Sequence, residues 1–348
     1  MNQEQRQKTI EEKRQEVIEE QRQEAIKKLG EEPVTEFTVH SLGEFCDIVD
    51  IVADTWRRKV AKRQTKKFNP APFYCGELSP WFRGVSNADY PCEPKLLRLD
   101  EKSLEFTGIQ KPIKLNTIEA YFLQRFKTFG TPFLERVPKE DIEWHFLMRH
   151  HELPSRLLDW SKGSFIALYF ATRKSLENLD SQENLDSNNR KPSSAVWMLE
   201  PRRLSEKSER NSRSIYGANR SEHLDIIKKY FPPKGTEIYC TYPLPIIPDM
   251  LAPRIQAHVG RFTLHTFNKG GLTEFAENTF DEDKLSYLVK IILPSDKHLA
   301  ISRSLRSTGV SDMNFTQDLD GLAKELSLRI NIGRCDHNRY MDEGSQEQ

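Results

Sequence analysis

Apolar residues recur every three or four positions in several stretches of the chain, and this spacing predicts amphipathic helices. The first begins at Ser41, which forms a capping box with Glu44, and ends in the basic run 59–67. Further helices are expected where the spacing returns: from Asn116, over 141–151, over 164–172 and from Thr316. The helix over 164–172 is apolar enough to be buried. The last helix is expected to bury Leu319, Leu322, Leu326 and Ile330.

Shorter apolar runs predict strands over 81–84, 195–199, 261–267 and 285–293. The charged stretch 202–220 is expected to be irregular, and the four prolines between 243 and 253 are expected to exclude regular structure there. Helices come early and strands late, so the predicted fold class is α+β. We expect a single main domain over 34–335, with a mixed or antiparallel sheet flanked by helices.

The first 30 residues contain three copies of an eight-residue unit, with isoleucine at 10, 18 and 26. Eight residues exceed two helical turns, so the isoleucines spiral around a helix and form no coiled-coil seam. Segment 1–30 is therefore interpreted as an exposed, charged helical extension. A partner-binding arm is the alternative interpretation, which would give the protein a protein partner through this helix.

The composition limits the function classes. Lys plus Arg and Asp plus Glu both number 52, and this balance gives no support to nucleic-acid binding. The five cysteines form no CxxC pair, which favours reduced thiols in the cytoplasm over a zinc site or a disulfide framework. No apolar run reaches 18 residues, so no membrane association is expected. Neither GxGxxG nor GxxxxGK[ST] occurs, which weighs against NTPases and Rossmann dehydrogenases.

The first motif with candidate chemistry spans 81–98. Arg83 follows two aromatic residues and precedes Gly84, which places a bidentate donor where backbone can be closely approached. Phosphate or carboxylate ligands suit such a donor. The alternative is an arginine that ties down the end of a strand.

The second motif spans 149–172 and gathers polar groups in a short turn before the apolar helix. His150, Arg156, Asp159 and Trp160 are candidates for a polar site there. Structural roles are equally open, because Arg156 and Asp159 are able to pair with each other, and Asp159 or Ser161 to cap the next helix. No metal is expected, since the adjacent His150 and His151 side chains diverge.

The third motif spans 252–265. Gln256 is able to orient a sugar hydroxyl or a water molecule through its amide. The alternative is an amide that satisfies backbone groups at a sheet edge.

These motifs, in this order, resemble the FRG domain family. The resemblance covers about 81–322 and lies in five segments: Phe82-Arg83-Gly84, 94–98, the long block 150–160, 167–171 and 254–263. Glu152 stands where the family usually has glycine, and Ser155 where it usually has threonine. The glutamate adds a negative charge beside the expected site.

The family resemblance implies a bacterial protein of the kind found alone or in toxin and phage-defence modules. The order of motifs is also similar to that of ADP-ribosyltransferases, in which an early arginine holds an NAD phosphate and a late glutamate serves the transfer. Arg83 matches the first role. Gln256 lies where the carboxylate is expected, but an amide cannot act as a base.

The leading hypothesis is therefore an ADP-ribosyltransferase-like protein that handles NAD or another small nucleotide. The expected ligand-binding residues are Arg83, Ser86, Arg156, Asp159, Trp160 and Tyr169. Within this set, Arg83 would hold phosphate, and Trp160 or Tyr169 would stack on a ring. His150 and Gln256 are the catalytic candidates and would orient the ribose. The alternative is a non-catalytic recognition module; a nucleic-acid enzyme ranks third.

Overall fold

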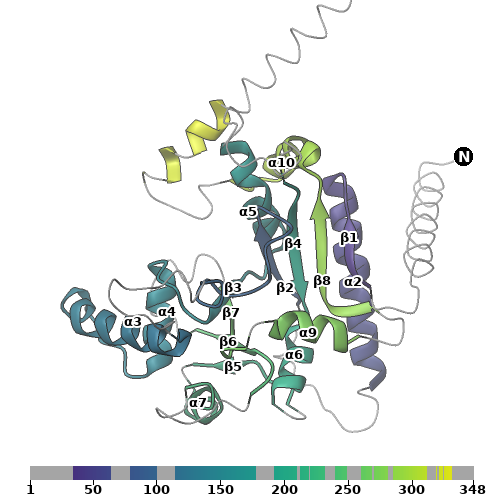
Figure 1. Cartoon of the computed structure of the whole chain (residues 1–348). Coiled ribbons are helices and arrows are strands. Elements are labelled where there is room, and N and C mark those ends of the chain that lie inside the picture. Colours follow the sequence, from purple (N-terminus) through teal and green to yellow (C-terminus); the bar gives the residue numbers. More distant parts are fainter. Residues whose placement is uncertain are drawn as a thin grey trace, which may run out of the picture.

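The computed structural model describes residues 34–63, 79–99, 114–177, 192–209, 212–218, 220–231, 240–248, 260–268, 270–280, 285–311, 319, 321–323 and 325–330. Within these ranges the fold is α+β, as predicted (Figure 1). The repeat of segment 1–30 lies outside the described residues, so its predicted helix is not tested.

The strands form two four-stranded sheets, where the sequence suggested one. The first sheet has the order β1 (Val34–Thr38), β8 (Leu285–Leu293), β4 (Ser194–Leu199), β2 (Trp81–Val85). The second has the order β3 (Leu157–Trp160), β7 (Arg261–Leu264), β6 (Leu244–Ile247), β5 (Tyr216–Gly217). Both sheets are mixed, because β1 runs parallel to β8 and β5 parallel to β6, while the other pairs are antiparallel.

Helices surround both sheets. The helices that belong to the first sheet are α2 (Leu42–Arg63), α5 (Ser164–Glu177), α9 (Gly271–Asn278) and α10 (His298–Ser307). Of these, α5 packs on β2 and β4, α9 packs on β8, and α10 contacts both α5 and α2. On the far side of the second sheet lie α3 (Leu115–Gly130) and α4 (Asp141–His150), with α7 (Ser221–Lys228) below (Figure 1). The two sheets are thus enclosed by different helices.

The two sheets meet where β2 passes β3. The amide of Phe82 donates to the carbonyl of Ser161 at 2.8 Å, and the amide of Ser161 donates back to Phe82 at 2.8 Å. Along β3, Leu158 and Trp160 belong to the main core, whereas Leu157 belongs to the smaller core of the second sheet. Because strand side chains alternate between faces, β3 forms a wall shared by both cores.

Gly84 allows β2 to lie directly against α5. A Cβ atom on Gly84 would stand 1.9 Å from the carbonyl oxygen of Ala167 and 2.7 Å from the amide nitrogen of Ala171. Both clashes involve helix backbone, which no side-chain rotation relieves. Glycine is therefore needed at this position because the backbone of α5 lies so close. The close approach of a ligand, suggested by the sequence, is not required to explain it.

Two predictions of irregular structure were wrong. The charged stretch contains most of α6 (Pro201–Ser208). Glu200 caps this helix, because its carboxylate accepts from the amide of Arg203 at 2.6 Å. Pro245 lies inside β6. Its missing N–H costs nothing toward β5, because β5 pairs only with Ile246 and Ile247.

The final helical stretch, 325–330, also differs from the prediction. Its orientation follows Glu325, which is buried and pairs with Arg306 of α10 and, at 2.9 Å, with Arg329. Leu328 is buried on this stretch as well, and the opposite face points outward. The apolar residues expected to be buried are exposed: Leu319, Leu322, Leu326 and Ile330.

We predict that Gly84→Ala lowers the free energy of unfolding by about 3 kcal/mol or more, because the methyl group meets the α5 backbone. Gly43→Ala is the matched control, since the nearest atom to its new Cβ is the Ser41 hydroxyl at 3.8 Å. The control should be neutral or slightly more stable, because alanine favours helix. Urea unfolding of both variants measures the difference, and equal stabilities would contradict the packing argument.

Candidate functional site

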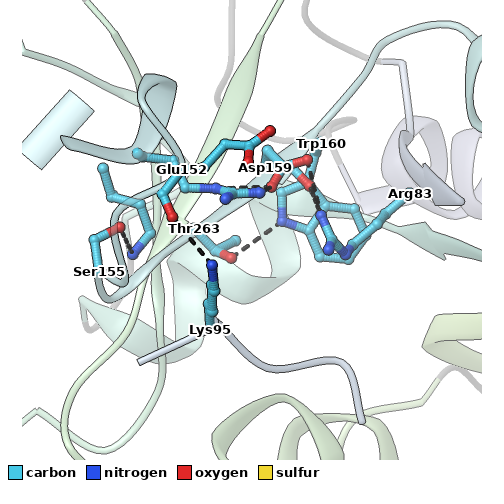
Figure 2. Close-up of polar contacts among 9 residues, drawn as sticks. Arg83, Lys95, Glu152, Ser155, Asp159, Trp160 and Thr263 are labelled. Carbon is cyan, nitrogen blue, oxygen red and sulfur yellow. Dashed lines mark hydrogen bonds and ion pairs between the residues drawn. The ribbon is translucent and has the colours of Figure 1, made fainter. Parts of the chain in front are cut away.

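Asp159 of β3 brings two arginines together. The Nη1 atom of Arg83, from β2, lies 2.9 Å from the Asp159 carboxylate and donates to the Asp159 carbonyl at 2.9 Å (Figure 2). Arg149, in the last turn of α4, donates from Nε to the other carboxylate oxygen at 3.1 Å, and its Nη2 contacts that same oxygen. The carboxylate therefore joins three elements that are far apart in sequence.

The charge of Asp159 is stabilised by these partners. Burial by itself would raise the pKa of this carboxyl, but Arg83 and Arg149 outweigh burial and hold the pKa well below its usual range. In turn, Asp159 is the main cause of a raised pKa for Arg149. These shifts favour the ionised forms of both Asp159 and Arg149.

A third guanidinium, that of Arg98, lies beside this pair. The turn that carries it is docked on the loop before β3, where Lys95 Nζ donates to the Glu152 carbonyl at 3.2 Å (Figure 2) and the Leu96 amide to the Ser155 carbonyl at 3.4 Å. Burial, and then the like charges of Arg83 and Arg149, lower the pKa of Arg98. We call Arg83, Arg98 and Arg149 the arginine cluster.

Arg98 differs from the other two members of the arginine cluster because it has no carboxylate partner in the described part of the chain. Arg83 and Arg149 also keep donor atoms that Asp159 does not use: Nε and Nη2 of Arg83, and Nη1 of Arg149. Guanidinium donors of this kind bind phosphate or carboxylate in a bidentate manner. The cluster is therefore a candidate anion site.

Arg156 has a different environment, in the interior. Its Nε lies 2.9 and 2.8 Å from the two carboxylate oxygens of Glu119 in α3. Its Nη1 donates to the carbonyls of Tyr230 and His265, both at 3.0 Å. The guanidinium also lies over the Phe231 ring, 4.9 Å from its centroid. With 2% of its surface exposed, Arg156 holds the fold together in this structure.

The ion pair considered for the second motif, between Arg156 and Asp159, is not formed. The two residues stand three positions apart on a segment that enters a strand, so their side chains do not converge. Arg156 pairs with Glu119, which lies 37 residues earlier, and Asp159 pairs with Arg83, which lies 76 residues earlier. Ser161 also does not cap α5; its hydroxyl donates to the Gly163 carbonyl at 2.8 Å.

Trp160 takes part in a buried chain of hydrogen bonds. Its indole N–H donates to the Thr263 hydroxyl at 3.0 Å (Figure 2), and this hydroxyl lies 3.0 Å from Nε2 of His265. Burial, followed by the positive charges of Arg156 and Arg83, lowers the pKa of His265 to about 3. The neutral imidazole accepts a hydrogen bond from the Thr263 hydroxyl. Trp160 is 3% exposed, so its ring faces the core.

The other predicted site residues are spread over the region. Tyr169 is buried in α5, with its ring against Phe170. His150 ends α4 next to Arg149 and is half-buried, with its ring against that of His151. Ser86 follows β2 and is half-buried. Gln256 lies outside the described residues, so its predicted place beside Arg83 and His150 stays a prediction.

Sequence reasoning missed two members of the arginine cluster and one neighbour. Arg98 ends the first motif and Arg149 begins the second, but the sequence alone assigns neither a role. Tyr90 is 42% exposed and close enough to Arg98 to influence its charge. Only tertiary contacts reveal these residues. Their sequence signal was the presence of two arginines in each of the two motifs.

The described residues contain neither a metal-binding cluster nor a membrane-spanning helix. No three His, Cys, Asp or Glu side chains among them come together as a metal site would require. None of their helices has the length and apolar character needed to cross a bilayer.

Comparison with known proteins gives one family. The FRG domain model matches residues 79–180. This stretch contains β2, α3, α4, β3 and α5, and with them every member of the arginine cluster and Asp159. Neither the curated proteins nor the solved structures include a match to this chain. The outer boundaries of the predicted domain, 34 and 335, stay a prediction.

Replacing Arg156 with methionine should lower the free energy of unfolding by about 3–5 kcal/mol, because Glu119 is left buried without its cation. The double variant Arg156→Met/Glu119→Leu should recover part of this loss, since it removes the unpaired carboxylate. Chemical denaturation of the three proteins completes the comparison. A single variant as stable as the parent would show that Arg156 is not the anchor of this region.

The buried neutral His265 should make the protein sensitive to acid. Its folded pKa is about 3, and the unfolded value is about 6.5. The unfolded chain therefore binds a proton first, so the free energy of unfolding falls as pH drops from about 6.5 toward 3. His265→Gln should flatten this dependence whatever it does to absolute stability. Denaturation curves at several pH values measure both slopes, and identical slopes would rule the explanation out.

Proposed function

We propose that this protein, which carries an FRG domain, binds the phosphate groups of a nucleotide at its arginine cluster. The observation that carries the proposal is Arg98, whose turn is docked through the Leu96 amide on the loop before β3 and which has no carboxylate partner among the described residues. Arg83 and Arg149 share the carboxylate of Asp159, and Arg98 adds a third positive charge nearby. An anion that reaches the cluster relieves the repulsion among the arginines.

The geometry favours a phosphate over a simple monovalent ion. The free donors come from strand β2, the last turn of helix α4 and the turn that carries Arg98, so they belong to three separate elements. A phosphate offers several oxygens to such a set, and each charge-assisted hydrogen bond is short and strong. Tyr90 adds an exposed ring next to Arg98, where a base or ribose is able to pack.

NAD is the nucleotide that the order of motifs favours. In that reading Arg83 contributes to phosphate binding, as expected from its motif. The stacking role expected for Trp160 or Tyr169 passes to Tyr90, because both former rings are buried. An ADP-ribosyltransferase-like activity, in a toxin or defence effector, extends this proposal through the motif order alone.

A recognition module without catalysis is the second candidate. One surface favours it: α3 exposes Tyr121, Arg125 and Phe129 on successive turns, and the Arg125 guanidinium lies 5.6 and 5.0 Å from the two ring centroids. Exposed tyrosine, phenylalanine and arginine are typical of protein interfaces. This surface lies on a helix that contributes nothing to the arginine cluster.

Calorimetric titration of ADP-ribose and NAD separates the two candidates. We expect binding to the parent and a loss of affinity of about tenfold or more in Arg98→Gln, since one charge-assisted contact is worth about 1.5–3 kcal/mol. Arg98 makes no ion pair in the described chain, so this variant should fold like the parent. Arg125→Gln is the matched control and should bind normally. Equal affinities of all three proteins, or no binding to the parent, would refute the nucleotide site.

A further inference from the structure

Glu152 has an unfavourable backbone conformation. Its φ is 62°, and no other residue of the described chain except two glycines has a positive φ. It follows the end of α4, where its amide donates to the Arg149 carbonyl at 3.1 Å and the Leu153 amide donates to the Met148 carbonyl at 2.9 Å. These two bonds form a Schellman motif, and Glu152 occupies the position at which glycine is preferred.

A side chain at this position costs stability, because in the left-handed region Cβ crowds the following carbonyl oxygen. The termination of α4 does not require glutamate, since glycine would make the same two hydrogen bonds without strain. Strained residues of this kind gather at sites where the side chain serves a function. The position of the carboxylate is therefore informative.

The Glu152 side chain is exposed and extends toward the Asp159 end of the arginine cluster (Figure 2). The Lys95 ammonium holds the Glu152 carbonyl at 3.2 Å, which fixes the turn and the direction of the side chain. In the view of Figure 2, the Glu152 side chain lies next to that of Asp159. The charge of Glu152 also raises the pKa of Arg149, although less than that of Asp159 does. The cluster thus has three cations and two neighbouring anions, and a small positive excess remains.

We infer that Glu152 determines which phosphates the nucleotide site accepts, favouring singly charged phosphodiester groups over doubly charged terminal phosphates. The inference rests on the nucleotide site proposed above. A bridging phosphate carries one negative charge, whereas a terminal phosphate carries nearly two at neutral pH. Repulsion from Glu152 acts on each charge, so it penalises the terminal group about twice as strongly.

AMP and ADP-ribose are the probes, because they carry the same total charge with different density. AMP has one terminal phosphate, and ADP-ribose has two bridging ones. In Glu152→Gln we expect the affinity for AMP to rise about tenfold and that for ADP-ribose about threefold, with both gains reduced by added salt. Glu152→Gly should give the same binding gains and, unlike Glu152→Gln, a higher urea midpoint. Glu222→Gln, at an exposed position of α7, is the matched control and should change neither affinity.

The outcomes are distinct. An AMP to ADP-ribose affinity ratio that shifts in both Glu152 variants and stays unchanged in the control supports the inference. If the parent binds ADP-ribose, Arg98→Gln loses that binding and the ratio stays constant in Glu152→Gln, the inference fails while the nucleotide site stands. If the parent binds neither probe, both fail. A ratio that shifts only in Glu152→Gly attributes the effect to the backbone and also overturns the role of the carboxylate.

Discussion

The buried guanidinium of Arg156 is the interaction on which the rest of the site depends. It joins Glu119 of α3 to the carbonyls of Tyr230, which follows α7, and His265, which follows β7. A charge in the interior is tolerated only when it is paired and hydrogen-bonded, and Arg156 meets both conditions. Its position sets where β3 begins, and β3 in turn places Asp159 three residues later.

From Asp159 the site is built outward by packing. The tripeptide Phe82-Arg83-Gly84 divides its tasks: Phe82 lies in the main core, Gly84 admits the backbone of α5, and Arg83 reaches Asp159. The packing of Phe82 and Gly84 therefore fixes the position of the Arg83 guanidinium between them. The side chain is well positioned because its neighbours along the strand are close-packed.

Much of the fold follows from local patterns in the sequence. The helices α3, α4 and α5 and the strands β4, β7 and β8 were predicted because each buries one face or lies wholly in the core, which gives a clear periodicity. Pro245 and Glu325 show where this reasoning fails. Strand β6 accommodates Pro245 because its neighbour β5 pairs only with the next two residues. Glu325 is buried because it pairs with Arg306 of another helix, which the local pattern does not reveal.

The candidate site was only half visible in the sequence, for a related reason. Motifs identify residues that stand close along the chain, so Arg156 and Asp159 suggested a pair. Their actual partners, Glu119 and Arg83, come from other elements. The sequence did not reveal Arg98 and Arg149 as site residues, because they are brought together only by the contact between the turn after Pro94 and the loop after α4. The predicted role of Gln256 lies outside the described residues and stays a prediction.

The wall that β3 forms between the two cores has a thermodynamic consequence. Neither sheet retains its full hydrophobic interior if the other separates, because Leu157 and Leu158 serve opposite sides of one strand. Loss of one core therefore exposes apolar surface of the next. The two halves are expected to melt in a single cooperative transition, and not as independent modules with separate midpoints.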